Sequence, residues 1–121
     1  MMAKTKIIPV MLTSNLLSKK IDFITVAALA EGFCVDYKQS DQRILMLFQN
    51  TSASAQHTIT VKKGNALQGI SDSEAFVIPA GQIAAMSVES GRFAFVSGAD
   101  IGTVNVVVSN AEVKMAAVVL P

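Results

Sequence analysis

Apolar and polar positions alternate over short stretches along most of the chain. The clearest case is residues 56–63, where Ile59 and Val61 share one face while the threonines and Lys62 share the other. Val104, Val106 and Val108 define a second such face near the end of the chain. Gly, Pro, Asn and Ser residues separate the stretches, and no helical period lies between them. The pattern predicts an all-β protein.

Residues 44–48 break this alternation because five successive positions are apolar. A strand of this kind is typically covered on both faces. Its inner face would meet the core. Its outer face would then need the N-terminal segment, another strand or another subunit.

Later segments add to the predicted set of strands. In residues 83–89 and 92–96, separated by Ser90 and Gly91, we expect a β-hairpin with Phe93 and Phe95 inward. Ala84, Met86 and Val88 would share one face of its first strand, and residues 113–120 form a nearly all-apolar last strand. Regular short strands of this kind favour an antiparallel β-sandwich of the jelly-roll or immunoglobulin-like type.

The start of the chain is interpreted as a separate unit. Pro9 has no N–H to donate, so the apolar residues around it cannot form a central strand. We therefore expect residues 1–20 to be an extended arm or edge strand, and residues 21–121 to be the β-sandwich domain. The arm either covers the bottom of its own domain or reaches a neighbouring subunit. In the second case the expected contact residues are Ile7, Ile8, Val10, Met11 and Leu12.

Composition favours a protein that makes contacts through uncharged surface. Of the 121 residues, 51% are hydrophobic and only 16% are charged, against about 25% charged in an average protein. Buried oligomer contacts are one use of such a surface. The net charge of +1 gives no field that would attract nucleic acid or anionic lipid. No apolar run approaches the ~20 residues of a membrane-spanning helix, so we expect no membrane partner.

The residues that could carry chemistry do not form a constellation. His57 is the only histidine and Cys34 the only cysteine, so neither a zinc set nor an internal disulfide is expected. We interpret His57 as a partly buried strand-end residue and Cys34 as a packing residue. The acidic loop residues Asp72, Glu74 and Asp100 lack the calcium-loop pattern. We predict a protein that is not an enzyme, with no cofactor, no metal and no small-molecule substrate.

Several turn-and-strand segments resemble a known class of protein. They are LFQNT (47–51), TVKKGNALQG (60–69), IPAG (78–81), VESGRF (88–93) and GADIG (98–102). In this pattern of strands and turns the chain is similar to small capsid-associated proteins of tailed bacteriophages, namely decoration (cement) proteins and head accessory proteins. The resemblance covers roughly residues 44–109 and leaves out the N-terminal unit and the apolar tail.

The resemblance implies a structural virion protein that binds the assembled phage head and stabilises it by non-covalent contacts. Its partners would be the major capsid protein and copies of itself. It would be located on the capsid surface after assembly in the bacterial host cytoplasm, which suits a lone reduced cysteine. The loop 64–73 is the second expected contact, through Leu67, Gln68 and Ile70.

The alternative function is an immunoglobulin-like module of a phage tail or fibre that binds a receptor or a carbohydrate. Such a module needs exposed aromatic rings for sugar stacking. Tyr37 is the only tyrosine and the chain has no tryptophan, which counts against this alternative.

Overall fold

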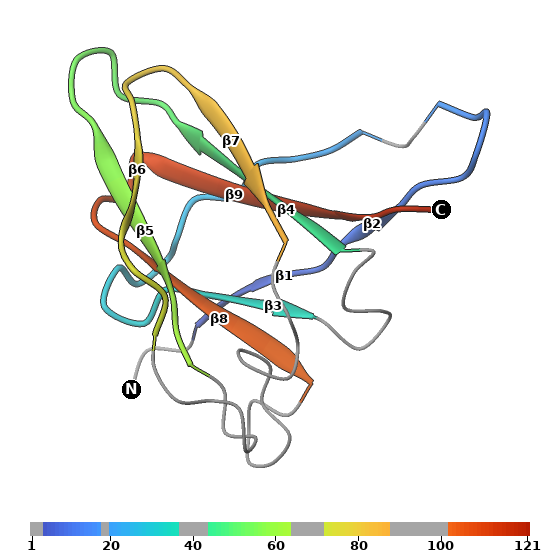
Figure 1. Cartoon of the computed structure of the whole chain (residues 1–121), viewed down its shortest axis with the longest axis horizontal. Helices are drawn as coiled ribbons and strands as arrows, with labels where there is room; N and C mark the ends of the chain where they lie inside the picture. Colours follow the sequence, from blue (N-terminus) through green and yellow to red (C-terminus); the bar gives the residue numbers. More distant parts are fainter. Residues whose placement is uncertain (1–3, 18–19, 37–43, 64–71, 88–101) are drawn as a thin grey trace.

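The computed structural model describes residues 4–17, 20–36, 44–63, 72–87 and 102–121, which form two β-sheets (Figure 1). The first sheet has the order β1 (Thr5–Ile7), β3 (Phe33–Asp36), β8 (Thr103–Val108), β5 (His57–Val61) and β6 (Phe76–Ile78). The second has the order β2 (Val10–Met11), β9 (Val113–Val119), β4 (Ile44–Asn50) and β7 (Ile83–Met86). The described residues contain no helix, and none of them forms a helix able to span a membrane. The all-β prediction is confirmed.

Both sheets are mixed, which corrects the prediction of purely antiparallel pairing. β1 runs parallel to β3 and β2 runs parallel to β9, whereas the other pairs are antiparallel. The parallel pairs come from the N-terminal segment, which joins one outer edge of each sheet in turn. Pro9 lies between these two strands, where its missing N–H costs no ladder bond.

The core lies between the two sheets because the chain keeps crossing from one to the other. Every step between consecutive described strands changes sheet, except the step from β5 to β6. Apolar side chains from both sheets therefore meet in one buried cluster. Val104, Val106 and Val108 are part of it, which confirms the face predicted for that strand.

β4 alternates in burial although its sequence does not. Ile44, Met46 and Phe48 are fully buried in the core. Leu45 and Leu47 lie on the opposite face, where they are half-buried beside their cross-strand partners on β9. Those partners, Val118 and Ala116, are themselves buried. The prediction that this strand is covered on both faces is therefore confirmed in part.

β7 begins the predicted hairpin. Ala84 and Met86 pack against the core, as their shared face predicted. Val88, Phe93 and Phe95 lie outside the described residues.

Gly32 fixes the place where β1 enters the first sheet. Its carbonyl oxygen accepts a hydrogen bond from Thr5 N at 2.9 Å, and its φ of +74° lies in the left-handed region. A Cβ atom at this position would collide with the backbone oxygen of Val106 on β8. Only glycine meets both conditions without strain.

Candidate contact surfaces

The N-terminal segment places its predicted contact residues differently. Ile8 is 77% exposed and Met11 is 65% exposed, while Val10 and Leu12 are half-buried. Ile7 is 2% exposed and belongs to the core. Its side chain thus packs inside its own chain, which removes it from the residues that could meet another subunit.

Beyond β2 the chain projects away from the sheets, at the upper right of Figure 1. We call residues 13–17 the arm tip. The last ladder contact before it is the hydrogen bond from Leu12 N to Val119 O, at 2.9 Å. Within the tip, Leu16 N donates to Thr13 O at 3.2 Å, and Asn15 has a left-handed φ of 67°. A single local turn therefore orders this segment.

The arm tip carries two of the most exposed apolar side chains of the described residues. Leu16 is 69% exposed and Leu17 is 99% exposed. Sequence reasoning did not single them out, although two adjacent leucines among polar residues without alternation were a visible signal. An exposed leucine pair on a projecting turn contributes nothing to the core of its own chain.

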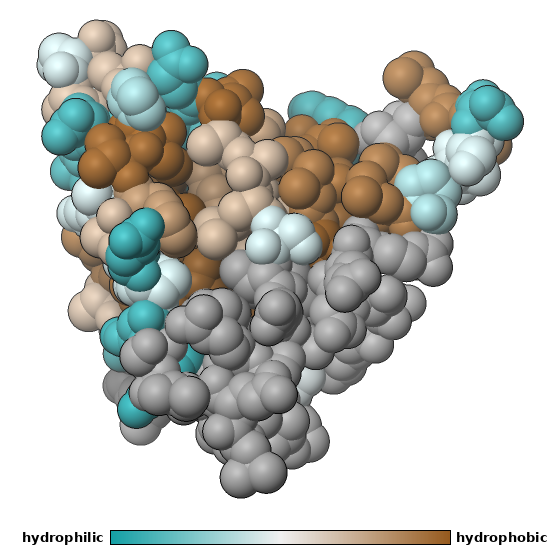
Figure 2. All heavy atoms as spheres, viewed as in Figure 1, coloured by the Kyte–Doolittle hydropathy of each residue, from teal (hydrophilic) through white to brown (hydrophobic). Residues whose placement is uncertain are grey.

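A second apolar surface lies between β6 and β7. Here a groove of about 360 Å³ is lined by Phe48, Ile59, Phe76, Val77, Ala84 and Met86, among others. Phe48 and Ile59 are core residues, so the groove opens onto the interior. Phe76 and Val77 are partly exposed on one wall. Figure 2 shows brown and tan side chains gathered over this side of the molecule.

The groove and the arm tip lie at opposite edges of the sheets. β1 and β2 are the first strands in the two sheet orders, and β6 and β7 are the last. In Figure 1 the tip lies beyond β2 on the right, while β6 and β7 lie to the left of it. The tip therefore extends away from the groove of its own chain.

Leu67, Gln68 and Ile70, predicted as the second contact, lie outside the described residues. The described chain resumes at Asp72, which is held by hydrogen bonds. Asp72 accepts hydrogen bonds from Lys62 Nζ at 2.7 Å and from Lys63 N at 2.8 Å. The hydrogen bond from Lys62, followed by that from the backbone of Lys63, lowers the pKa of the Asp72 carboxyl. This carboxylate thus fixes the chain that leads into β6.

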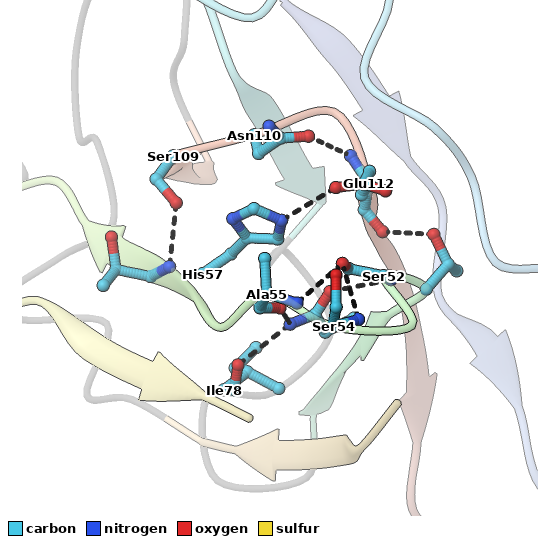
Figure 3. Close-up of polar contacts among 11 residues, drawn as sticks. Ser52, Ser54, Ala55, His57, Ile78, Ser109, Asn110 and Glu112 are labelled. Carbon is cyan, nitrogen blue, oxygen red and sulfur yellow. Dashed lines mark hydrogen bonds and ion pairs between the residues drawn. The ribbon is translucent and has the colours of Figure 1, made fainter. Parts of the chain in front are cut away.

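A polar cluster lies at one end of the sheets (Figure 3). His57 Nε2 lies 3.0 Å from Glu112 Oε1, and the histidine side chain is 12% exposed. The neighbouring Ser109 Oγ accepts a hydrogen bond from Thr58 N at 2.9 Å. The serine is thereby held by the backbone and the imidazole by a carboxylate. The interpretation of His57 as a partly buried strand-end residue is confirmed.

Asn50 connects several backbone groups of the same cluster through hydrogen bonds. Its side chain is fully buried, and its amide nitrogen donates to the carbonyl oxygens of Ala55 and Ile78, each at 3.0 Å. Its amide oxygen accepts from Ser52 N at 3.0 Å. These bonds satisfy backbone groups of the β4–β5 connection and the end of β6, as buried polar groups require. Asn50 thus ties the second sheet to the wall of the groove.

The remaining candidate residues form no metal-binding group within the described ranges. Those ranges hold no group of three His, Cys, Asp or Glu side chains that could bind a metal ion. Cys34 is buried on β3, as expected of a packing residue. Asp100 lies outside the described residues.

Comparison of the chain with protein-family models, with curated proteins and with solved structures gives no match in any of the three. Two apolar surfaces are the candidate contact sites of the described residues. One is a projecting tip and the other is a groove. Both suit contact with another protein, because each offers apolar area that its own chain leaves exposed.

Proposed function

We propose that the chain is a structural virion protein of a tailed bacteriophage, a decoration or cement protein that binds the assembled head. One observation carries the proposal: exposed leucines are collected on a segment that projects from the sheets and is unnecessary to the core. Burial of such side chains against another protein stabilises a complex by about 1.5–3 kcal/mol each before the costs of association. A cement protein needs non-covalent contacts of this kind.

The proposed fold is a β-sandwich of the jelly-roll or immunoglobulin-like type. The two sheets sharing one core support the sandwich. The anchored strands β1 and β2 would hold the projecting tip at a fixed place on the surface. The proposed partners are the major capsid protein and further copies of this chain.

The low fraction of charged residues supports the same reading. A surface contact that excludes water loses free energy for every unpaired charge that it buries. Residues 13–17 carry no charged side chain. The tip can therefore enter an apolar contact without desolvating an ion.

Co-sedimentation with undecorated heads tests the proposal. The heads would be assembled from the major capsid protein encoded in the same genome, and the chain would be added at increasing concentration. We expect saturable binding and a higher temperature of head disruption. A parallel titration against glycans of the host surface separates the competing function. Saturable glycan binding without head binding would replace the cement function by the tail or fibre module.

A further inference from the structure

We propose that the arm tip of one copy occupies the β6–β7 groove of a second copy of this chain. The inference deepens the proposed function by naming one partner, and it rests on that function for the array in which copies meet. Its starting point is that one chain carries both an exposed apolar segment and an apolar groove, and leaves each without the other.

The sheet orders keep the tip from filling the groove of its own chain. The tip follows β2, at the outer edge of one sheet. The groove lies between β6 and β7, at the other edge of both sheets. Two further strands, β9 and β4, separate β2 from β7 within the second sheet. The tip of a neighbouring molecule can approach the groove from outside.

The two surfaces also match in charge. The described residues that line the groove all have apolar side chains, and residues 13–17 are uncharged. Lys20 and Asp22, which follow the tip, form an exposed ion pair at 3.5 Å and can remain in water. A charged occupant would lose hydration in this groove without gaining a partner. The two leucine side chains of the tip carry no charge and have no ionic hydration to lose.

The outer edge of β6 can add a backbone contribution. β6 is the last strand of its sheet within the described residues, and no described strand pairs with the N–H and C=O groups of that edge. An extended segment entering the groove can pair with such an edge, as peptides do in strand addition. Leucine side chains would then supply the apolar contact and the edge would supply direction.

A contact of this type is heterologous, because the tip of the first copy meets the groove of the second. Repetition of one such contact produces a ring or an open chain of copies instead of a closed two-fold dimer. A ring of copies could surround a capsomer, and an open chain could follow a seam between capsomers. The groove of the last copy in an open chain stays available for the next.

The size of the contact sets its strength. Two leucines bury much less apolar area than a stable protein–protein interface does, and association also costs freedom of motion. Free copies should thus associate weakly, and copies held side by side on a head should associate much more strongly because of the raised effective concentration.

Cysteine cross-linking of the free protein tests the contact. One preparation would carry Leu17→Cys and the other Val77→Cys, both with Cys34→Ala. The two would be mixed at high concentration and oxidised. We expect about tenfold more cross-linked dimer than from Leu17→Cys mixed with Ile8→Cys, whose exposed residue lies at the opposite edge. Tenfold corresponds to ~1.4 kcal/mol, roughly one leucine's contribution.

A chain carrying both Leu17→Cys and Val77→Cys should give a ladder of dimers, trimers and larger species. A yield equal to that of the Ile8→Cys control would overturn the inference. So would a cross-linked monomer from the double variant, because the tip would then reach its own groove. If circular dichroism shows that Val77→Cys does not fold, Ala85→Cys on the other groove wall replaces it.

Failure of this inference and failure of the proposed function remain distinguishable. The cross-linking uses no heads, so its result is independent of the capsid. Head binding without the tip–groove cross-link would leave the cement function standing with the major capsid protein as sole partner. The cross-link without head binding would leave self-association and remove the cement function.

Discussion

The N-terminal segment contains two neighbouring regions that contrast sharply. Residues 4–11 supply an edge strand to each sheet and place Ile7 in the core. Residues 13–17 form a local turn of their own, closed by the hydrogen bond from Leu16 N to Thr13 O, and leave Leu17 almost fully exposed. Both regions are short, partly apolar and close to each other in sequence. The difference is that only the first has a strand beside it to complete a ladder.

The two regions differ in whether their apolar side chains stabilise the fold or stay available for contact with another protein. An apolar residue contributes to stability where the sheets already provide a wall, as Ile7 does beside Val35 on β3. An apolar residue on a turn that leaves the sheets has no such wall. Its free energy becomes available only when another surface covers it.

The largest predicted effect is on Ile7. Ile7→Ala should lower the free energy of unfolding by about 3 kcal/mol, because it leaves a cavity in the core. Leu17→Ala, the matched change on the exposed side of the comparison, should alter it by less than about 0.5 kcal/mol. Urea denaturation followed by circular dichroism measures both. Equal losses in the two variants would show that the tip also packs on its own chain.

The next effect concerns the turn that seats β1. Gly32→Ala should cost about 2–3 kcal/mol, because the new methyl group meets the Val106 carbonyl and the backbone is left-handed. Gly81 has a similar φ of +73° but open space around its Cβ position. Gly81→Ala should therefore cost only about 1–2 kcal/mol, from conformation alone. Thermal unfolding ranks the two, and a reversed order would contradict the role given to Gly32.

The smallest effect concerns the chain that leads into the groove wall. Folding lowers the pKa of Asp72, so its contribution to stability is present at neutral pH and is lost as the pH falls through that lowered pKa. Because the Lys62–Asp72 pair is partly exposed, this contribution is at most ~0.5 kcal/mol. Asp72→Asn should remove it. Urea midpoints at pH 7 and pH 2.5 should then differ less in the variant than in the wild type.

The periodicity of apolar residues in the strands gave the most reliable predictions from the sequence. The alternation at Ile59 and Val61 and the valines of β8 follow from the two-residue period of a strand, and these faces were predicted correctly. Parallel pairing of β1 and β2 could not be predicted, since direction is set by which distant strand lies at the sheet edge. Pro9 excluded a central strand without indicating that the chain changes sheets there.

The contact surfaces were harder to predict than the core. The sequence marked the N-terminal segment as a whole, and burial then divided it into Ile7 inside and Ile8 and Met11 outside. The groove could not be predicted from the sequence, because its walls, β6 and β7, come together only through the order of strands in both sheets. Apolar positions alone do not tell which of them a fold leaves uncovered.

The central claim is that the arm tip contributes to contact with another protein and not to folding. The binding isotherm of a Leu16→Ser/Leu17→Ser variant on undecorated heads tests this claim most directly. Leu29→Ser, on an exposed turn near β3, is the matched control. We expect the double variant to bind heads at least roughly tenfold more weakly than the wild type and the control, with an unchanged unfolding midpoint. Head binding of wild-type strength by the double variant would contradict it.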